Sequence, residues 1–141
     1  MTKMPRQALP PSHAPVIPRF LKQVVSGGSV VMFGKGMQTR DFVYISDVVS
    51  ALAAAATADR VSRAIINIGS GQEVSITQLI GKIERAVGRE AHRLLNDAED
   101  GGVPRLVADI RLAGELLKWK PQVSLEEGLK LILAEDERFR K

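Results

Sequence analysis

The chain has 141 residues, 45% hydrophobic, 26% charged and 4% aromatic, with a formal net charge of +4, which is the composition of one globular domain with an aliphatic core. The absence of cysteine excludes disulfides and thiolate chemistry. No apolar run reaches the ~18 residues of a membrane span and no export signal opens the chain, so we expect a cytoplasmic protein. The basic residues are scattered without interleaved aromatic residues, so no nucleic-acid partner is expected.

The first part of the chain is predicted to be an extended arm leading into a domain. Prolines recur through residues 1–15, and proline disfavours packed regular structure. The domain is expected to occupy residues 16–141. Apolar residues at helical spacing predict a first helix over Val16 to Val25, which Gly27 and Gly28 terminate.

Two short strands and a helix are predicted next. Residues 30–33 form an apolar run between glycines, and residues 41–45 form a second run rich in strand formers, including Tyr44. An apolar stripe then predicts a helix over residues 47–57, with Ser46 or Asp47 as its N-terminal cap.

The clearest unit is a strand, a turn and a helix between residues 64 and 88. A continuous apolar run at 64–68 predicts a strand, and the turn at 69–71 follows it. Ser75 is positioned to cap a helix that ends at Gly88. Further helices are expected over 109–117 and over 124–139, the second opened by a capping box of Ser124 and Glu127.

These elements predict a small α/β or α+β domain in which helices outweigh a few short strands. The strands around 42–45 and 64–68 are too short to form a complete sheet. Their edges and faces should therefore remain uncovered and apolar, and we expect this surface to seek a partner.

Arg40 is the strongest candidate ligand residue. It lies shortly after the glycine turn at 34–36 and just before the predicted strand at 41–45, and a planar guanidinium can present two donors to a phosphate. On the residues alone, Arg40 and Asp41 could instead pair with local backbone or with each other, and Phe33 could be an ordinary core aromatic.

The segment from Gly34 to Val48 belongs to an ordered set of motifs that resembles a known family. The other members of the set are Val16 to Phe20, Asn67 to Gly71, Val74 to Ile76, Ala108 to Ile110, Leu117 to Pro121 and Ser124 to Gly128. Together they resemble the C-terminal, substrate-binding part of the extended short-chain dehydrogenases that act as NAD-dependent nucleotide-sugar epimerases and dehydratases, such as UDP-glucose 4-epimerase and dTDP-glucose 4,6-dehydratase.

The resemblance implies particular roles for three residues. The arginine that matches Arg40 contacts the diphosphate of the nucleotide sugar in this family, and the apolar residues that match Val31 and Phe33 lie against the base. The loop at 69–71 is chiefly a tight connection in the family, so we favour a turn there over a phosphate site at a helix N-terminus.

The catalytic parts of the family are missing from the sequence. Its NAD-binding Rossmann domain needs a glycine-rich turn of the GxGxxG kind, and this chain has none. The family's base is a tyrosine followed four residues later by lysine, whereas the one tyrosine, Tyr44, is followed at that distance by Val48. We therefore expect no catalytic residue, no cofactor-binding residue and no NAD bound by this chain.

A second departure from the family pattern lies at residues 99–102. The family has an arginine and then Gly-Asp at this place, whereas this chain reads Glu99, Asp100, Gly101 and Gly102. The family's arginine is a diphosphate donor and its aspartate a ribose acceptor. Their loss puts the affinity for nucleotide in question.

Other catalytic schemes find little support. His13 and His92, the two histidines, have no spacing that suggests a metal site or a triad, and both should face solvent. The adjacent acids Glu126 and Glu127, like those at 135–137, are better explained by a solvated helix face than by paired-carboxylate catalysis.

Two functional interpretations remain open from the sequence. The first is the substrate-binding portion of an epimerase or dehydratase, inactive alone, whose partner is a separate NAD-binding half or a second copy of the chain. The alternative is a non-catalytic interaction or regulatory module, or the remnant of a truncated gene, that keeps the fold without nucleotide binding.

Overall fold

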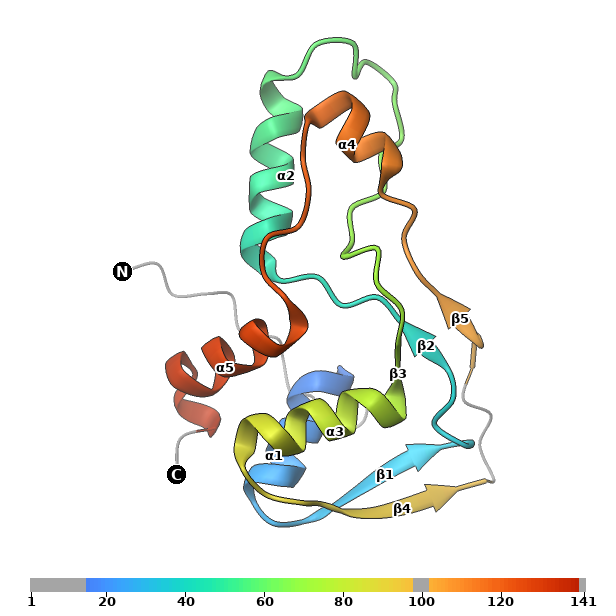
Figure 1. Ribbon diagram of the computed structural model, residues 1–141, viewed down its shortest axis with the longest axis vertical. Coiled ribbons are helices and arrows are strands. Elements are labelled where there is room, and N and C mark those ends of the chain that lie inside the picture. The colour runs from blue at the N-terminus through green and yellow to red at the C-terminus, as the bar shows by residue number, and fades with distance from the viewer. Residues whose placement is uncertain (1–14, 98–101, 140–141) are drawn as a thin grey trace.

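The computed structural model describes residues 15–97 and 102–139, which form two lobes joined by a narrow middle region (Figure 1). The helices are α1 (Val16–Val25), α2 (Ile45–Thr57), α3 (Ile76–Val87), α4 (Arg111–Leu117), α5 (Leu125–Glu135) and the 3-10 helix η1 (Glu137–Phe139). The strands are β1 (Ser29–Phe33), β2 (Thr39–Arg40), β3 (Val74–Ser75), β4 (His92–Asn96) and β5 (Arg105–Leu106). The chain is thus a helix-rich α/β structure with short strands, as predicted. None of the helices in the described ranges is long and apolar enough to cross a membrane.

The lower lobe contains the larger hydrophobic core. Helices α1, α3 and α5 pack together around the parallel pair of β1 and β4, in which Ser29 lies opposite His92 and Phe33 opposite Asn96 (Figure 1). The largest side chains that this core buries completely are Phe20, Leu21, Val24, Val30, Leu79, Ile80, Ile83 and Leu129. Burial of each such leucine or isoleucine contributes about 2 kcal/mol, so this lobe supplies most of the hydrophobic stabilisation.

Helix α3 forms where the local sequence predicts it. The Ser75 hydroxyl accepts the Gln78 backbone N–H, and the Gln78 side chain accepts the Ser75 N–H, which completes a capping box. Gly88 ends the helix in the left-handed conformation, at φ 74°. Its buried residues, Ile76, Leu79, Ile80 and Ile83, follow the helical spacing that faces the lower core.

A small three-stranded sheet crosses the middle region. Strand β2 is its centre, antiparallel to β3 and parallel to β5. Glu73 ties the three strands together, because it accepts hydrogen bonds from the Thr39 hydroxyl at 2.8 Å and from the Arg105 Nε at 2.9 Å. The Thr39 hydrogen bond, followed by that of Arg105, lowers the pKa of the Glu73 carboxyl.

The upper lobe is smaller and more open. Helices α2 and α4 pack around Ala51, Ala113, Leu117 and Trp119, and the segment 58–68 runs alongside them (Figure 1). The Trp119 indole N–H donates to the Ser50 hydroxyl at 2.8 Å, which satisfies the polar atom of this buried ring.

The segment 41–45 corrects two sequence predictions. It is not a strand: β2 ends at Arg40, and α2 begins at Ile45, with Tyr44 at the N-cap position and no side-chain cap. Asp47, predicted as a cap, is instead 3% exposed, and its Oδ2 accepts the backbone N–H groups of Gln122 and Val123. The carboxylate thus stabilises a distant segment rather than its own helix.

Two other predicted elements differ from the structure. Residues 64–68 form no strand, because no other segment in the described ranges pairs with them. The helix predicted over 124–139 ends at Glu135, and η1 follows it and buries Phe139 in the lower core. Ser124 caps α5 by accepting the Glu127 N–H, as predicted. The predicted arm lies outside the described residues except for Pro15, and so do residues 99–101.

The buried Asp47 carboxylate gives a prediction about stability. Replacement by alanine leaves the N–H groups of Gln122 and Val123 without their acceptor, and we expect a loss of about 2 kcal/mol in the free energy of unfolding. Urea unfolding followed by circular dichroism measures this loss. The exposed Asp59 is the matched control, and its alanine variant should change stability by less than about 0.5 kcal/mol. Equal stability of the two variants would contradict the assigned role.

Candidate functional site

The two apolar candidates, Val31 and Phe33, lie on the same face of β1. Val30 and Met32 alternate with them and are buried in the lower core, so Val31 and Phe33 point to the opposite face and remain half-buried. Val31 pairs with the partly exposed Leu94 of β4. Neither candidate therefore belongs to the buried core, and both remain partly exposed to solvent.

Arg40 occupies the end of β2, after the turn that follows Phe33. Its Nη1 donates to the carbonyl oxygens of Thr39 and Val103, both at 2.7 Å. A Cβ built on Gly102 would lie 4.0 Å from Arg40 Nη2, so the chain at 102–103 runs beside the guanidinium. Arg40 thus lies next to Gly102, the last residue of the segment 99–102 in which the sequence departs from the family pattern.

Asp41, the next residue, organises the middle region. Its Oδ1 accepts the backbone N–H of Ser70 at 2.7 Å and the Ser70 hydroxyl at 2.5 Å. Its Oδ2 accepts the N–H groups of Gly71 at 2.9 Å and Ala108 at 3.2 Å. These hydrogen bonds join Arg40 and Asp41 to groups from three segments. None of them joins Arg40 to Asp41.

The close approach at Asp41 explains the glycines of the 69–71 loop. A Cβ on Gly69 would lie 2.6 Å from Ala108 Cβ and 2.7 Å from Asp41 Oδ2, which is too close for any side chain. Gly71 has φ 70°, a conformation that favours glycine. The Asp41 carboxylate accepts the Ser70 and Gly71 N–H groups, so these amides are not available to a phosphate. This supports the prediction that the 69–71 loop is a tight connection and not a phosphate site.

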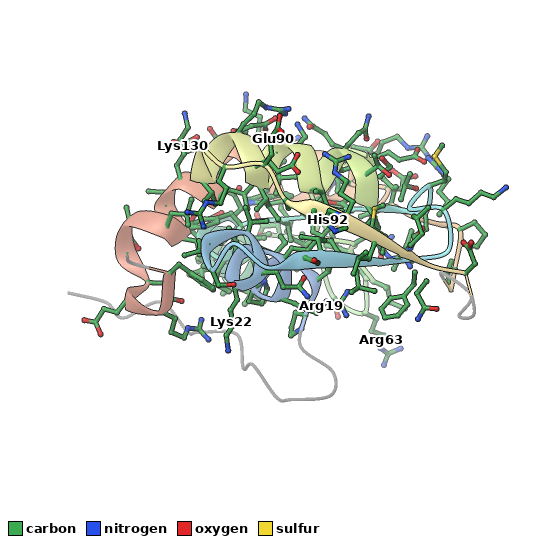
Figure 2. All side chains as sticks on the ribbon, turned by 90° about the horizontal axis from the view of Figure 1, so that it is seen from below. Arg19, Lys22, Arg63, Glu90, His92 and Lys130 are labelled. Atoms are coloured by element: carbon green, nitrogen blue, oxygen red, sulfur yellow. The ribbon has the colours of Figure 1, made fainter. Side chains whose placement is uncertain are left out.

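Arg19 joins this face of β1, which the sequence analysis did not predict. Its guanidinium carbon lies 5.4 Å from the centre of the Phe33 ring and 5.1 Å from that of Phe20. In Figure 2 the labelled Arg19 lies on the side of the sheet away from α3. The sequence carried one signal: a cationic residue in the first turn of α1 without any acidic residue in that turn.

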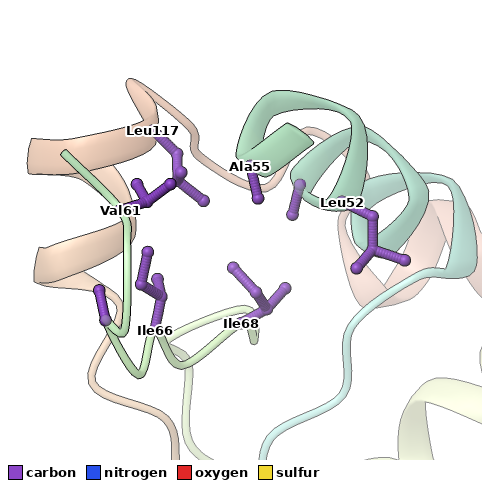
Figure 3. Close-up of a pocket in the computed structure, with 8 residues that line it drawn as sticks. Leu52, Ala55, Val61, Ile66, Ile68 and Leu117 are labelled. Carbon is purple, nitrogen blue, oxygen red and sulfur yellow. The ribbon is translucent and has the colours of Figure 1, made fainter. Parts of the chain in front are cut away.

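Two hollows lie elsewhere on the molecule. The larger is an apolar groove of about 350 Å³ in the upper lobe, lined by Ala51, Leu52, Ala55, Val61, Ala64, Ile66, Ile68 and Leu117 (Figure 3). The smaller, of about 170 Å³, lies between the 70–74 segment and residues 121–125. Neither hollow is lined by Val31, Phe33 or Arg40.

The remaining titratable candidates do not form a catalytic group in the described residues. Burial, and next the charge of Glu135, raise the pKa of the Tyr44 phenol, the opposite of what a catalytic phenolate needs. His92 is exposed on β4, and Glu126 pairs with Lys82 of α3. His13 lies outside the described residues.

The β3–α3 junction does not offer the Gln78 N–H to a pyrophosphate. Binding of a pyrophosphate at a strand-to-helix junction needs free backbone N–H groups in the first helical turn. At the β3–α3 junction the Gln78 N–H is occupied by the Ser75 hydroxyl.

Comparison with known proteins identifies the relatives of this fold. Residues 5–69 match the sequence model of the NAD dependent epimerase/dehydratase family. A putative UDP-glucose 4-epimerase of Methanocaldococcus jannaschii is 36% identical over 124 residues, which is 88% of this chain and 39% of that protein.

Solved structures agree with this match. A UDP-glucose 4-epimerase of Thermotoga maritima, determined with UDP-glucose, superposes with a TM-score of 0.84 at 34% identity over 93% of this chain and 41% of that one. A UDP-glucuronic acid 4-epimerase of Bacillus cereus, determined with UDP-glucuronic acid and NAD, gives a TM-score of 0.77 at 33% identity, over 88% of this chain and 39% of that one. The chain thus spans about two fifths of the length of these relatives.

The role of Asp41 can be tested by hydrogen exchange. In Asp41→Ala the N–H groups of Ser70, Gly71 and Ala108 lose their acceptor, which lowers the free energy of local opening by more than about 1.4 kcal/mol. We therefore expect the hydrogen exchange of these three amides to accelerate at least about tenfold. The Gln78 N–H, bound by Ser75, is the internal control and should keep its rate. Uniform acceleration at all four amides would indicate global destabilisation instead of a local clamp.

Proposed function

The chain belongs to the NAD-dependent epimerase/dehydratase family, and from this membership we propose that it is the C-terminal, nucleotide-sugar-binding portion of such an enzyme. The observation that carries the proposal is the place of Arg40, which lies on β2 beside the 102–103 segment, with Val31 and Phe33 on the preceding strand. Arg40 would bind the diphosphate, and Val31 and Phe33 would lie against the base. The relatives determined with UDP-sugars support UDP-linked sugars as the ligand class to test.

The contacts of Arg40 are compatible with phosphate binding. Nη1 is held by the two carbonyl oxygens of Thr39 and Val103, which fixes the plane of the guanidinium. A fixed plane loses little conformational entropy when it binds an anion. The departure at residues 99–102 removes two further family contacts, and we therefore expect weak nucleotide affinity.

We propose that the chain alone does not catalyse epimerisation or dehydration. The sequence has no tyrosine followed four residues later by lysine, and Tyr44 lies at the start of α2 with a raised phenol pKa. Hydride transfer would require NAD and a base from another segment or another chain.

The exposed apolar surface of the upper lobe supports the need for such a second part. Leu52, which lines the apolar groove, is 66% exposed (Figure 3). Ile65, the neighbour in sequence of the lining residue Ile66, is 89% exposed. The chain corresponds to 41% of the Thermotoga maritima enzyme, so most of that fold has no counterpart here. We propose that the cofactor-binding part of the family fold covers this surface, and that residues 64–68 form a strand against it.

The second candidate function is a non-catalytic interaction module. The same uncovered apolar surface favours it, because a partner other than a cofactor-binding part could occupy the groove. Nucleotide binding separates the two candidates, since only the first requires it. Both candidate functions are compatible with the predicted division of the chain into an arm at residues 1–15 and a domain at residues 16–141.

Calorimetric titration of the chain with UDP-glucose, UDP, dTDP-glucose and NAD tests the first candidate. We expect binding of a uridine or thymidine nucleotide without NAD, and about tenfold weaker binding in Arg40→Ala, because a charge-assisted hydrogen bond is lost. Arg40→Lys keeps the charge without the planar fork and should give an intermediate affinity.

Arg105→Ala is the matched control for this titration. Arg105 lies on the neighbouring strand β5 and pairs with Glu73, and it has no proposed ligand contact. Its variant should bind nucleotide like the unmodified chain. Failure of all four ligands to bind would refute the first candidate and leave the interaction module.

The exposed apolar surface gives a prediction about association. Without its covering part, the chain should self-associate at high concentration in sedimentation velocity, and Leu52→Glu should reduce this association because a charge enters the groove. Leu95→Glu is the control, since Leu95 is similarly exposed, at 60%, but lies on β4 of the lower lobe. Equal effects of both variants, or a monomer at every concentration, would count against an interaction surface in the upper lobe.

A further inference from the structure

Arg19, in the first turn of α1, lies close to two aromatic rings. Its guanidinium carbon lies 5.1 Å from the ring centre of Phe20 and 5.4 Å from that of Phe33. The negative faces of aromatic rings attract cations at such distances. The contact with Phe33 therefore places the guanidinium at the face of β1 that carries Val31 and Phe33.

The charge of Arg19 has no anionic partner in the described residues. Its Nε is buried and has no hydrogen-bond partner. No acidic residue lies in the first turn of α1, and the N-terminal end of a helix is itself an unfavourable place for a cation. Burial lowers the pKa of the guanidinium, which reflects the same cost of desolvation. An anion at this position would compensate the positive charge of Arg19 and supply a hydrogen-bond acceptor.

Arg138 shows how the chain stabilises a comparable arginine. Its guanidinium carbon also lies 5.4 Å from a ring centre, that of Phe139. Asp136 neutralises it, with Arg138 Nη2 donating to the Asp136 Oδ2 at 2.6 Å and Nε donating to the same carboxylate. The two arginines share the aromatic contact and differ in the anion. What Arg19 lacks is thus the acceptor that Asp136 supplies to Arg138.

We propose that Arg19 binds a phosphate oxygen of the nucleotide ligand, beside the base subsite formed by Val31 and Phe33. This inference rests on the proposed nucleotide-binding function. Arg19 on α1 and Arg40 on β2 then contribute two cations to one ligand from two separate elements. The planar guanidinium is suited to bidentate phosphate recognition.

Titration with UDP and with uridine tests this role, because the two ligands share the base and differ in the phosphates. In Arg19→Gln we expect UDP affinity to fall about tenfold or more, and uridine affinity to stay the same. Arg138→Gln, the matched control, should bind both ligands like the unmodified chain. Thermal unfolding of both variants shows whether either substitution perturbs the fold.

Two results of this titration would overturn the inference. UDP affinity that is unchanged in Arg19→Gln would mean that Arg19 makes no ligand contact. An equal loss of UDP and uridine affinity would mean that Arg19 positions the base site instead of binding phosphate. Arg19→Lys refines a positive result, since partial affinity for UDP is expected from a charge without a planar fork.

A magnetic resonance measurement separates this inference from the proposed function. The Arg19 Nε–H signal, assigned by its absence in Arg19→Gln, should shift in a saturable way on addition of UDP or of inorganic diphosphate. A shift with diphosphate, together with failure of UDP to bind, would retain the anion site and refute the nucleotide function. Binding of UDP with an unmoved Arg19 signal would retain the function and refute the role of Arg19.

Discussion

The structure depends most on two aspartate carboxylates that accept backbone amides in the narrow middle region. Asp41 binds groups of Ser70, Gly71 and Ala108, and Asp47 binds the amides of Gln122 and Val123. A carboxylate satisfies several backbone donors at once, and hydrogen bonds to a charged acceptor are stronger than neutral ones. The chain from the end of β2 to the first turn of α2 is thereby fixed to three later parts of the chain, although β2, β3 and β5 have only two residues each.

This clamp also determines the geometry of the candidate site. Arg40 precedes Asp41 directly, so the bonds of Asp41 fix where the arginine lies relative to the 102–108 segment. The contact of Arg40 with the Val103 carbonyl oxygen follows from that placement. The lower lobe then supplies Val31, Phe33 and Arg19 on the opposite face of β1 from its core. The proposed ligand residues thus depend on both the polar clamp and the hydrophobic core.

The two lobes differ in how complete they are. The lower lobe buries a large aliphatic core, whereas the upper lobe leaves an apolar groove and the highly exposed Leu52 and Ile65. Exposed apolar surface of this kind marks contact sites in proteins. Together with a chain that spans about two fifths of its relatives, this supports the proposal of a binding portion that needs a second part for catalysis.

The sequence by itself determined the features that depend on neighbours along the chain. The helix Val16–Val25 and the capped helix Ile76–Val87 follow from apolar periodicity, from Ser75 and from Gly88. The family resemblance, carried by ordered motifs, also came from the sequence. These features are local, or rest on motif order, so no knowledge of the folded chain was needed.

Only the tertiary structure decided the features that need a partner distant in sequence. Residues 64–68 have strand composition, yet a strand also requires a neighbour, and the described residues supply none. Asp47 is a residue type that often caps helices, but its carboxylate accepts the backbone N–H groups of Gln122 and Val123, 75 and 76 positions away. The contact of Arg19 with Phe33 is of the same kind. Local propensity cannot specify such pairs, because the folded chain alone brings their members together.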